Sequence, residues 1–187
     1  QADAANTGYT PASGPTSGDV TWTFDTGRPN EEVTTVPGTE VGTGTTNVFS
    51  SPAIVNGRVY VGSNDGSLYA IDAASGDQQW VFETDDAVAS SPTVADGRVY
   101  VGSNDDTLYA VDAESGEEVW RYDATGNVFA SPTVHDGTIY AGSVGGEVFA
   151  VDAESGDEVW RVGHGDRVLS TPAVRDGTVY VGTWNED

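Results

Sequence analysis

The stretch YAVDAESGEEVW, residues 109–120, decides the fold because the chain repeats it. Nearly the same letters occur forty residues earlier as YAIDAASGDQQW, residues 69–80, and forty residues later as FAVDAESGDEVW, residues 149–160. A constant period of this length predicts a repeat architecture in which each unit is one small element that packs against its neighbours.

Each period divides into four short strands, expected in the first copy at 53–55, 58–63 and 67–72 and from 78 onward. Val, Ile, Tyr, Phe and Trp dominate these segments, and no stretch shows helical spacing. The first two strands are joined by dipeptides that accept positive φ at both centres of a type I′ hairpin. These dipeptides are Asn56-Gly57, Asp96-Gly97, Asp136-Gly137 and Asp176-Gly177. The sequence therefore predicts an all-β propeller of four-stranded antiparallel blades.

A second tight turn is expected between the third and fourth strands. Asp112 can bond its own backbone there, and Gly116 supplies a left-handed position. Trp120 offers a large flat surface with one N–H to satisfy, while the small Ala110 leaves room for an indole. Because a blade is hydrophobic on both faces, we predict that these positions couple neighbouring blades and are not catalytic. The full predicted docking set is Trp22, Ala70, Asp72, Gly76, Trp80, Ala110, Asp112, Gly116, Trp120, Ala150, Asp152, Gly156 and Trp160.

The spacing Ala-x-Asp-x-x-Ser-Gly-x-x-x-Trp resembles the tryptophan-docking repeat of the PQQ-like (quinoprotein-type) β-propellers, including BamB-like members. The resemblance covers residues 47–183. WD40 propellers are disfavoured because Trp is followed here by Val or Arg in place of Asp. The resemblance implies a wheel that usually has eight blades, of which this chain forms a partial ring of about four.

The whole chain, 1–187, is interpreted as a single propeller domain and a fragment of a ring. We expect an N-terminal lead-in at 1–19, an inserted rim loop at 28–44, blades at about 47–86, 87–126 and 127–166, and a partial blade at 167–187. Residues 20–25, VTWTFD, are expected to form an outer strand that places Trp22 for docking. The ring then continues in further sequence, is completed by a second chain, or closes at four blades through residues 20–25.

The chain carries 30 acidic residues against 7 basic ones, all of them Arg, and its net charge is −23. This field argues against nucleic acid and anionic lipid as partners. No run of about 18 apolar residues suits membrane insertion, and no signal-type segment is present. Abundant carboxylates without Lys favour adaptation to high salt and resemble proteins of salt-loving archaea, whereas the alternative of calcium sites lacks a D-x-[DN]-x-[DN]-G run. By analogy with the family, an exported or cell-surface location is expected.

The loops that join second to third strands, and one blade to the next, differ between the copies. They are expected to form the binding face, with unconstrained drift as the alternative. Arg167 suits a carboxylate or phosphate but also a nearby Asp. Trp184 suits a flat ligand or the covering of a blade edge, and His164 suits acid, base or ligand chemistry or plain solvation. The candidate binding residues are Asn47, Asn127, His164, Arg167 and Trp184.

The sequence contains no Cys, so thiolate nucleophiles and disulfides are excluded. It also lacks a nucleophile elbow, a P-loop and the zinc-protease motif. The resemblance implies either a quinoprotein dehydrogenase that uses PQQ and calcium, or a non-catalytic module. No ligand residue of the dehydrogenases maps onto this chain. We therefore predict a binding or scaffold module without catalytic, cofactor or metal residues, whose partner is a protein or a second copy that completes the ring.

Overall fold

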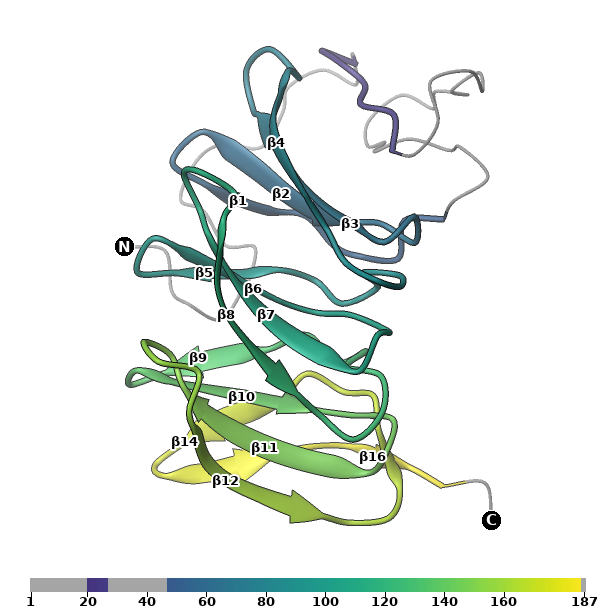
Figure 1. Cartoon of the computed structure of the whole chain (residues 1–187), viewed down its shortest axis with the longest axis vertical. Helices are drawn as coiled ribbons and strands as arrows, with labels where there is room; N and C mark the ends of the chain where they lie inside the picture. The colour runs from purple at the N-terminus through teal and green to yellow at the C-terminus, as the bar shows by residue number, and fades with distance from the viewer. Residues whose placement is uncertain (1–19, 27–46, 186–187) are drawn as a thin grey trace.

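The structure is a computed structural model that describes residues 20–26 and 47–185; the expected lead-in and rim loop lie outside these residues. The chain is all-β, as predicted, and the described residues contain no helix that is long and apolar enough to cross a membrane. Three four-stranded antiparallel sheets follow one another in a curved stack, and we call each sheet a blade (Figure 1).

The strands run in sequence order across each blade. Blade 1 consists of β1 (Ala53–Val55), β2 (Arg58–Gly62), β3 (Ser67–Asp72) and β4 (Gln78–Glu83). Blade 2 consists of β5 (Thr93–Ala95), β6 (Arg98–Gly102), β7 (Thr107–Asp112) and β8 (Glu118–Asp123). Blade 3 consists of β9 (Thr133–His135), β10 (Thr138–Gly142), β11 (Glu147–Asp152) and β12 (Glu158–Gly163). The predicted four-strand division of the repeat is therefore confirmed.

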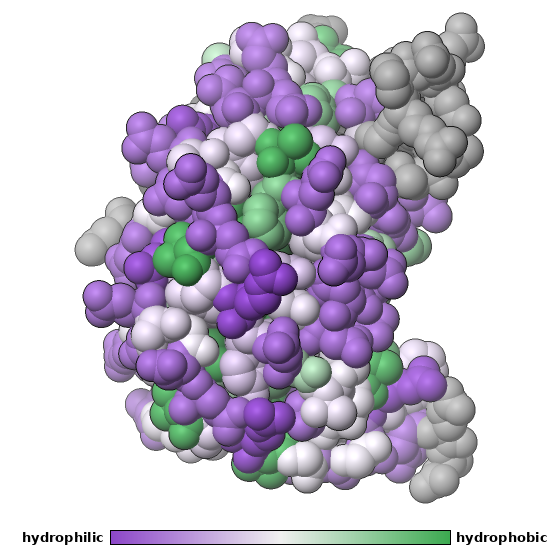
Figure 2. All heavy atoms as spheres, viewed as in Figure 1, coloured by the Kyte–Doolittle hydropathy of each residue, from purple (hydrophilic) through white to green (hydrophobic). Residues whose placement is uncertain are grey.

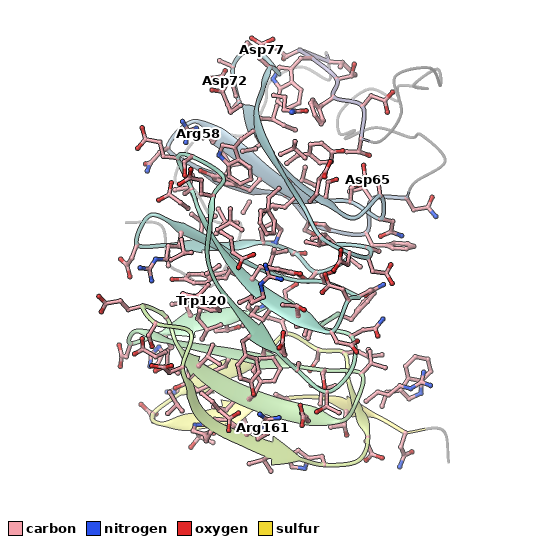
Figure 3. The ribbon with its side chains drawn as sticks, in the orientation of Figure 1. Arg58, Asp65, Asp72, Asp77, Trp120 and Arg161 are labelled. Carbon is pink, nitrogen blue, oxygen red and sulfur yellow. The ribbon has the colours of Figure 1, made fainter. Side chains whose placement is uncertain are left out.

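The predicted hairpin turns are also confirmed. Asn56 and Gly57 have φ values of 51° and 77°, and the corresponding dipeptides of the other copies have positive φ as well. In the second turn, the N–H groups of Ala74 and Ser75 both donate to Asp72 Oδ1 at 2.9 Å. Because the strands are antiparallel, both turns lie on one edge of the blade, which we call the turn face, and the β2–β3 loop lies on the opposite edge, the loop face. Figure 3 shows Asp72 on the first edge and Asp65 on the second.

Trp80 and Trp120 each reach across to the following blade. Trp80 Nε1 donates to the Ala113 carbonyl at 3.2 Å, and Trp120 Nε1 donates to the Ala153 carbonyl at the same distance. A Cβ on Gly116 would stand 2.7 Å from Cδ2 of Trp80, so only glycine leaves space for the docked indole. Ala70 lies directly opposite Trp80 within the same blade, so the surface that receives the indole is the next blade's turn.

A tyrosine and an arginine of the second strand join the same contact. Tyr60 Oη and Arg58 Nη1 donate to the Ala113 carbonyl at 3.0 and 2.7 Å, so this oxygen accepts three donors from the preceding blade. Tyr100 and Arg98 bond the Ala153 carbonyl in the same way. Sequence reasoning missed these residues, although their signal was the repeated string RVYVG.

The hydrophobic core lies between the blades. One cluster joins Leu68 and Trp80 of blade 1 to Val88, Val99 and Val111, which belong to the second repeat. Near the inner strands, the N–H of Val88 donates to the Ser63 carbonyl at 2.9 Å. A Cβ on Gly62 would come within 2.6 Å of Val88, so this glycine permits the close approach of the two repeats. Neighbouring blades are therefore held together at both their inner and outer strands.

The two ends of the stack differ from the expected strands. Only Phe24 forms a bridge within the expected strand at 20–25, because no described strand runs along this segment as β3 runs along β4. At the other end, β14 (Ala173–Arg175) pairs with β15 (Thr178–Tyr180), and β13 (Arg167–Val168) pairs with β16 (Thr183–Trp184). β15 ends earlier than β2 and β6, whose last residues pair with a third strand.

Residues 20–26 and β14–β15 lie at opposite ends of the stack (Figure 1). The structure therefore does not form the four-blade closure in which residues 20–25 pair with the last two strands.

Candidate functional site

The loop face carries one backbone hydrogen bond that recurs in the first three repeats, and the last repeat pairs the two equivalent residues between strands. The N–H of Asn64 donates to the Asn47 carbonyl at 3.2 Å, and the same bond joins the two corresponding residues of the next two repeats at 2.8 Å. In the last repeat, Arg167 pairs with Trp184 between β13 and β16. The four pairs are Asn47 with Asn64, Ala87 with Asn104, Asn127 with Val144, and Arg167 with Trp184. The backbone is thus constant where the side chains change.

Four of the five candidate binding residues belong to this row of pairs, which includes Asn47, Asn127, Arg167 and Trp184. Trp184 is 57% exposed, so the blade edge does not bury it. Two further residues of the row, Asn64 and Asn104, each hold a buried Oδ1 atom without a hydrogen-bond partner in the described part of the chain. From repeat to repeat, the row carries Asn, Ala, Val, Arg or Trp, so the polarity, the charge and the aromatic surface of the face differ between repeats.

His164, the remaining candidate, lies in the loop that follows β12. Its backbone N–H donates to the Gly146 carbonyl at 2.7 Å, which holds this loop beside the β10–β11 loop. Its side chain is exposed and reaches none of the other candidates through a hydrogen bond or ion pair. The structure therefore assigns His164 to the loop face but not to the row of pairs.

Two exposed phenylalanines at equivalent positions accompany the row, and sequence reasoning missed them. Phe49 is 63% exposed and Phe129 is 39% exposed, whereas Ala89 holds the same position in the second repeat. They follow Val48 and Val128, just before the inner strands β1 and β9. The sequence feature that could have identified them is a position that alternates between Phe and smaller residues in the repeats, just ahead of the repeated Pro.

The loop-face carboxylates of blades 1 and 2 are bound to their own loops. Asp65 Oδ2 accepts the Tyr69 hydroxyl at 2.7 Å, and Asp105 Oδ2 accepts the Tyr109 hydroxyl at 2.8 Å. Burial raises the pKa of Tyr109 to about 12, and the hydrogen bond to Asp105 adds to this rise. Blade 3 has Gly145 and Phe149 in these two places, so both partners change together.

The turn-face carboxylates likewise accept hydrogen bonds from the backbone of their own turns. Hydrogen bonds from the backbone of Ser75 and then Ala74 lower the pKa of Asp72, and Asp112 and Asp152 are lowered by the same kind of contact. In residues 20–26 and 47–185, no three His, Cys, Asp or Glu side chains gather as a metal site would require. The described residues thus gather no cluster of carboxylates of the kind that commonly holds calcium.

The repeated blades, the docked indoles and the variable loop face define this molecule as a β-propeller of PQQ-like repeats. The family described as outer membrane protein assembly factor BamB matches residues 8–131 and 126–187. The chain belongs to this family. No curated protein matches the sequence.

Solved structures show the same fold. BamB from Moraxella catarrhalis is 28% identical, with a TM-score of 0.65 over 73% of this chain and 44% of that one. Quinohemoprotein alcohol dehydrogenase from Comamonas testosteroni is also 28% identical, with a TM-score of 0.56 over 62% of this chain and 21% of that one. The computationally designed Ika4 protein shares the fold at 18% identity, with a TM-score of 0.67 over 82% of this chain and 92% of that one. The chain thus spans less than half the length of both natural proteins.

Proposed function

We propose that the chain is a non-catalytic binding module whose loop face holds a protein partner. One observation carries the proposal: four equivalently placed pairs, three of them joined by the same backbone hydrogen bond, present different side chains, from Asn47 with Asn64 to Arg167 with Trp184. Because repeats diverge most where packing does not constrain them, this face is where specificity can change without loss of the fold.

The chemistry of the face indicates the kind of partner. Phe49 and Phe129 expose apolar rings, and Asp85, Asp86 and Asp106 expose carboxylates in the neighbouring loops. The chain as a whole carries a charge of −23. A protein segment that combines an apolar side chain with positively charged residues complements this surface.

A random peptide library displayed on phage tests this assignment. We expect selected peptides to be rich in Arg or Lys and to contain an aromatic or aliphatic residue. Phe129→Ala should weaken the best peptide by about tenfold or more, as truncation of an interface anchor does. Val119→Ala, on the outer strand β8, is the matched control and should leave affinity unchanged. Equal affinity for both variants would contradict the proposed binding face.

The second candidate function is part of a PQQ- and calcium-dependent dehydrogenase, favoured by the likeness to the Comamonas enzyme. Added PQQ and calcium, with dye-coupled oxidation of an alcohol or sugar as the readout, distinguish the two functions. Sustained turnover would overturn the binding module.

We further propose an exported or cell-surface location and adaptation to high salt, which the acidic composition supports. Self-association that completes the ring is the other partner interaction that we propose.

A further inference from the structure

The first hairpin turn of blade 1 differs from its counterparts in one residue. Asn56 precedes Gly57 in this turn, whereas the other copies have Asp96, Asp136 and Asp176 before their glycines. It is the only Asn-Gly dipeptide in the chain. All four residues have a left-handed backbone, with φ of 51° for Asn56 and of 48°, 48° and 51° for the aspartates. The turn therefore accepts a carboxylate in place of the amide without a change of conformation.

The same turn leaves accessible the two groups that react when an asparagine cyclises. Asn56 and Gly57 are both exposed, on the turn face, which is largely hydrophilic with separate hydrophobic spots at the left of Figure 2. Among the described residues, neither the Asn56 amide nor the N–H of Gly57 takes part in a hydrogen bond. A Cβ on Gly57 would meet nothing within 4 Å, so the space around this residue is open.

We propose that Asn56 is a site of spontaneous deamidation, with water as the only co-reactant. The backbone nitrogen of Gly57 loses its proton and bonds to Cγ of Asn56. The bond from Cγ to Nδ2 breaks, and the side-chain nitrogen leaves as ammonia. Water then opens the resulting cyclic imide. Addition at Cγ gives an ordinary aspartate, whereas addition at the backbone carbonyl carbon gives isoaspartate, in which the main chain runs through Cγ.

The conformation of the turn controls the rate of this reaction. The left-handed backbone of Asn56 turns the Gly57 nitrogen away from the Asn56 side chain, whereas the five-membered imide needs both on the same side of the Cα–C bond. Ring closure therefore requires local opening of the hairpin, which occurs more often than global unfolding. Once the hairpin is open, glycine favours ring closure because it has no side chain beside the attacking nitrogen.

The two products differ in their effect on the contact between blades 1 and 2. An ordinary aspartate keeps the turn, as the other copies show. Isoaspartate lengthens the main chain between Val55 and Arg58, which pair across the turn. The Gly57 carbonyl accepts the N–H of Ala73 at 2.9 Å, and Arg58 Nη1 donates to the Ala113 carbonyl of blade 2 at 2.7 Å. We expect isoaspartate to disturb both bonds and to weaken the junction of the two blades.

Incubation of the folded chain at mildly alkaline pH and about 2 M KCl, followed by peptide mass spectrometry, tests the proposal. Conversion replaces an amide with a carboxyl group, and fragmentation distinguishes aspartate from isoaspartate. We expect Asn56 to convert about tenfold or more faster than the asparagines that precede Val or Asp, whose side chains hinder ring closure. These internal controls are Asn47, Asn64, Asn104 and Asn127. Asn56 should convert faster still in the chain unfolded by urea, where the turn is open.

Urea unfolding of the incubated chain measures the consequence. The midpoint of the isoaspartate-containing fraction should fall, whereas the matched variant Asn56→Asp should keep the midpoint of the fresh wild type, because a carboxylate is a poor electrophile and cyclises slowly. An Asn56 that stays intact in the folded chain while the unfolded chain converts it, or that reacts no faster than the internal controls, would overturn the proposal. An unchanged midpoint after conversion to isoaspartate would overturn the weakened junction. These outcomes are independent of the peptide-binding test, because Asn56 lies on the turn face.

Discussion

Two glycines with the same backbone conformation separate the roles of glycine in this fold. Gly97 and Gly116 both have φ of +77°. A Cβ on Gly97 would meet nothing within 4 Å, whereas a Cβ on Gly116 would stand 2.7 Å from the indole of Trp80. Gly97→Ala therefore introduces only backbone strain. Gly116→Ala introduces the same strain and also displaces the docked tryptophan.

The free energies of unfolding follow from these contacts. A non-glycine residue in the left-handed region costs about 1–2 kcal/mol, which is the whole expected loss for Gly97→Ala. In Gly116→Ala the indole must retreat by about 1 Å to restore carbon–carbon contact. It then loses the bond to the Ala113 carbonyl, worth about 1 kcal/mol. It also loses part of its burial, about 60 Å² or about 1.5 kcal/mol. We expect Gly116→Ala to be less stable than Gly97→Ala by about 2–3 kcal/mol.

Urea unfolding of both variants at the same high salt concentration measures this difference through the midpoint at constant slope. Trp80 is 8% exposed, so its displacement should also shift tryptophan emission in the folded state of Gly116→Ala and not of Gly97→Ala. Equal midpoints would refute the reasoning, because they would show that the docking turn needs glycine only for its backbone conformation.

Acid should destabilise the fold, because hydrogen bonds from Ser115 lower the pKa of Asp112. A lowered pKa in the folded state stabilises the fold at pH values above the unfolded-state pKa of about 3.9, and this stabilisation is lost as the pH falls through the folded-state pKa. The urea midpoint should therefore fall less between about pH 6 and pH 2 in Asp112→Asn than in the wild type. An identical pH dependence in the two proteins would contradict this prediction. Tyr109 should ionise with a pKa of about 12, because burial and the hydrogen bond to Asp105 raise the pKa of its hydroxyl. The difference in phenolate absorbance between the wild type and Tyr109→Phe, followed as a function of pH, measures this pKa. Ionisation at the ordinary tyrosine value of about 10 would contradict the prediction. Raising KCl from about 0.1 to 2 M should raise the urea midpoint by screening the charge of −23, and a constant midpoint would argue against salt adaptation.

The fold was predictable because the repeat places the same chemistry at the same spacing several times. Asn56-Gly57 and its counterparts predict the first hairpin of each unit, and the structure has positive φ at these positions. The identity of the receiving surface was not predictable, because the acceptor for Trp80 is a backbone carbonyl, that of Ala113. A carbonyl is present at every residue, so its role leaves no mark in the sequence.

The ends of the stack were less predictable for a different reason. A strand forms where a neighbouring strand satisfies its backbone, and VTWTFD at 20–25 has the composition of a strand but no described strand along it. Likewise Val181 and Gly182 match residues of β2 yet lie outside β15, because no third strand pairs with them in the described part. Composition predicts which residues suit a sheet, whereas pairing decides where each strand ends.

The loop face was predictable as a place but not as a set of residues. Loop variation drew attention to Arg167 and Trp184, and the structure pairs them with each other. Phe49 and Phe129 were missed because an aromatic residue beside an inner strand is expected to be buried. Their exposure depends on the tertiary packing around them, which the local sequence does not indicate.

The joint change of Asp105 and Tyr109 to Gly145 and Phe149 shows how such a face can diverge. A part-buried carboxylate–phenol contact is lost at least cost when both partners change, since a change of either one alone leaves a polar group without its partner. Blade 3 then anchors its loop differently: Thr125 donates through both its N–H and its hydroxyl to the carboxylate of Glu147. In this loop, two residues therefore change as a coupled pair while the docking turn of the same blade stays constant. This coupling lets a repeated scaffold acquire a specific surface without losing its interfaces.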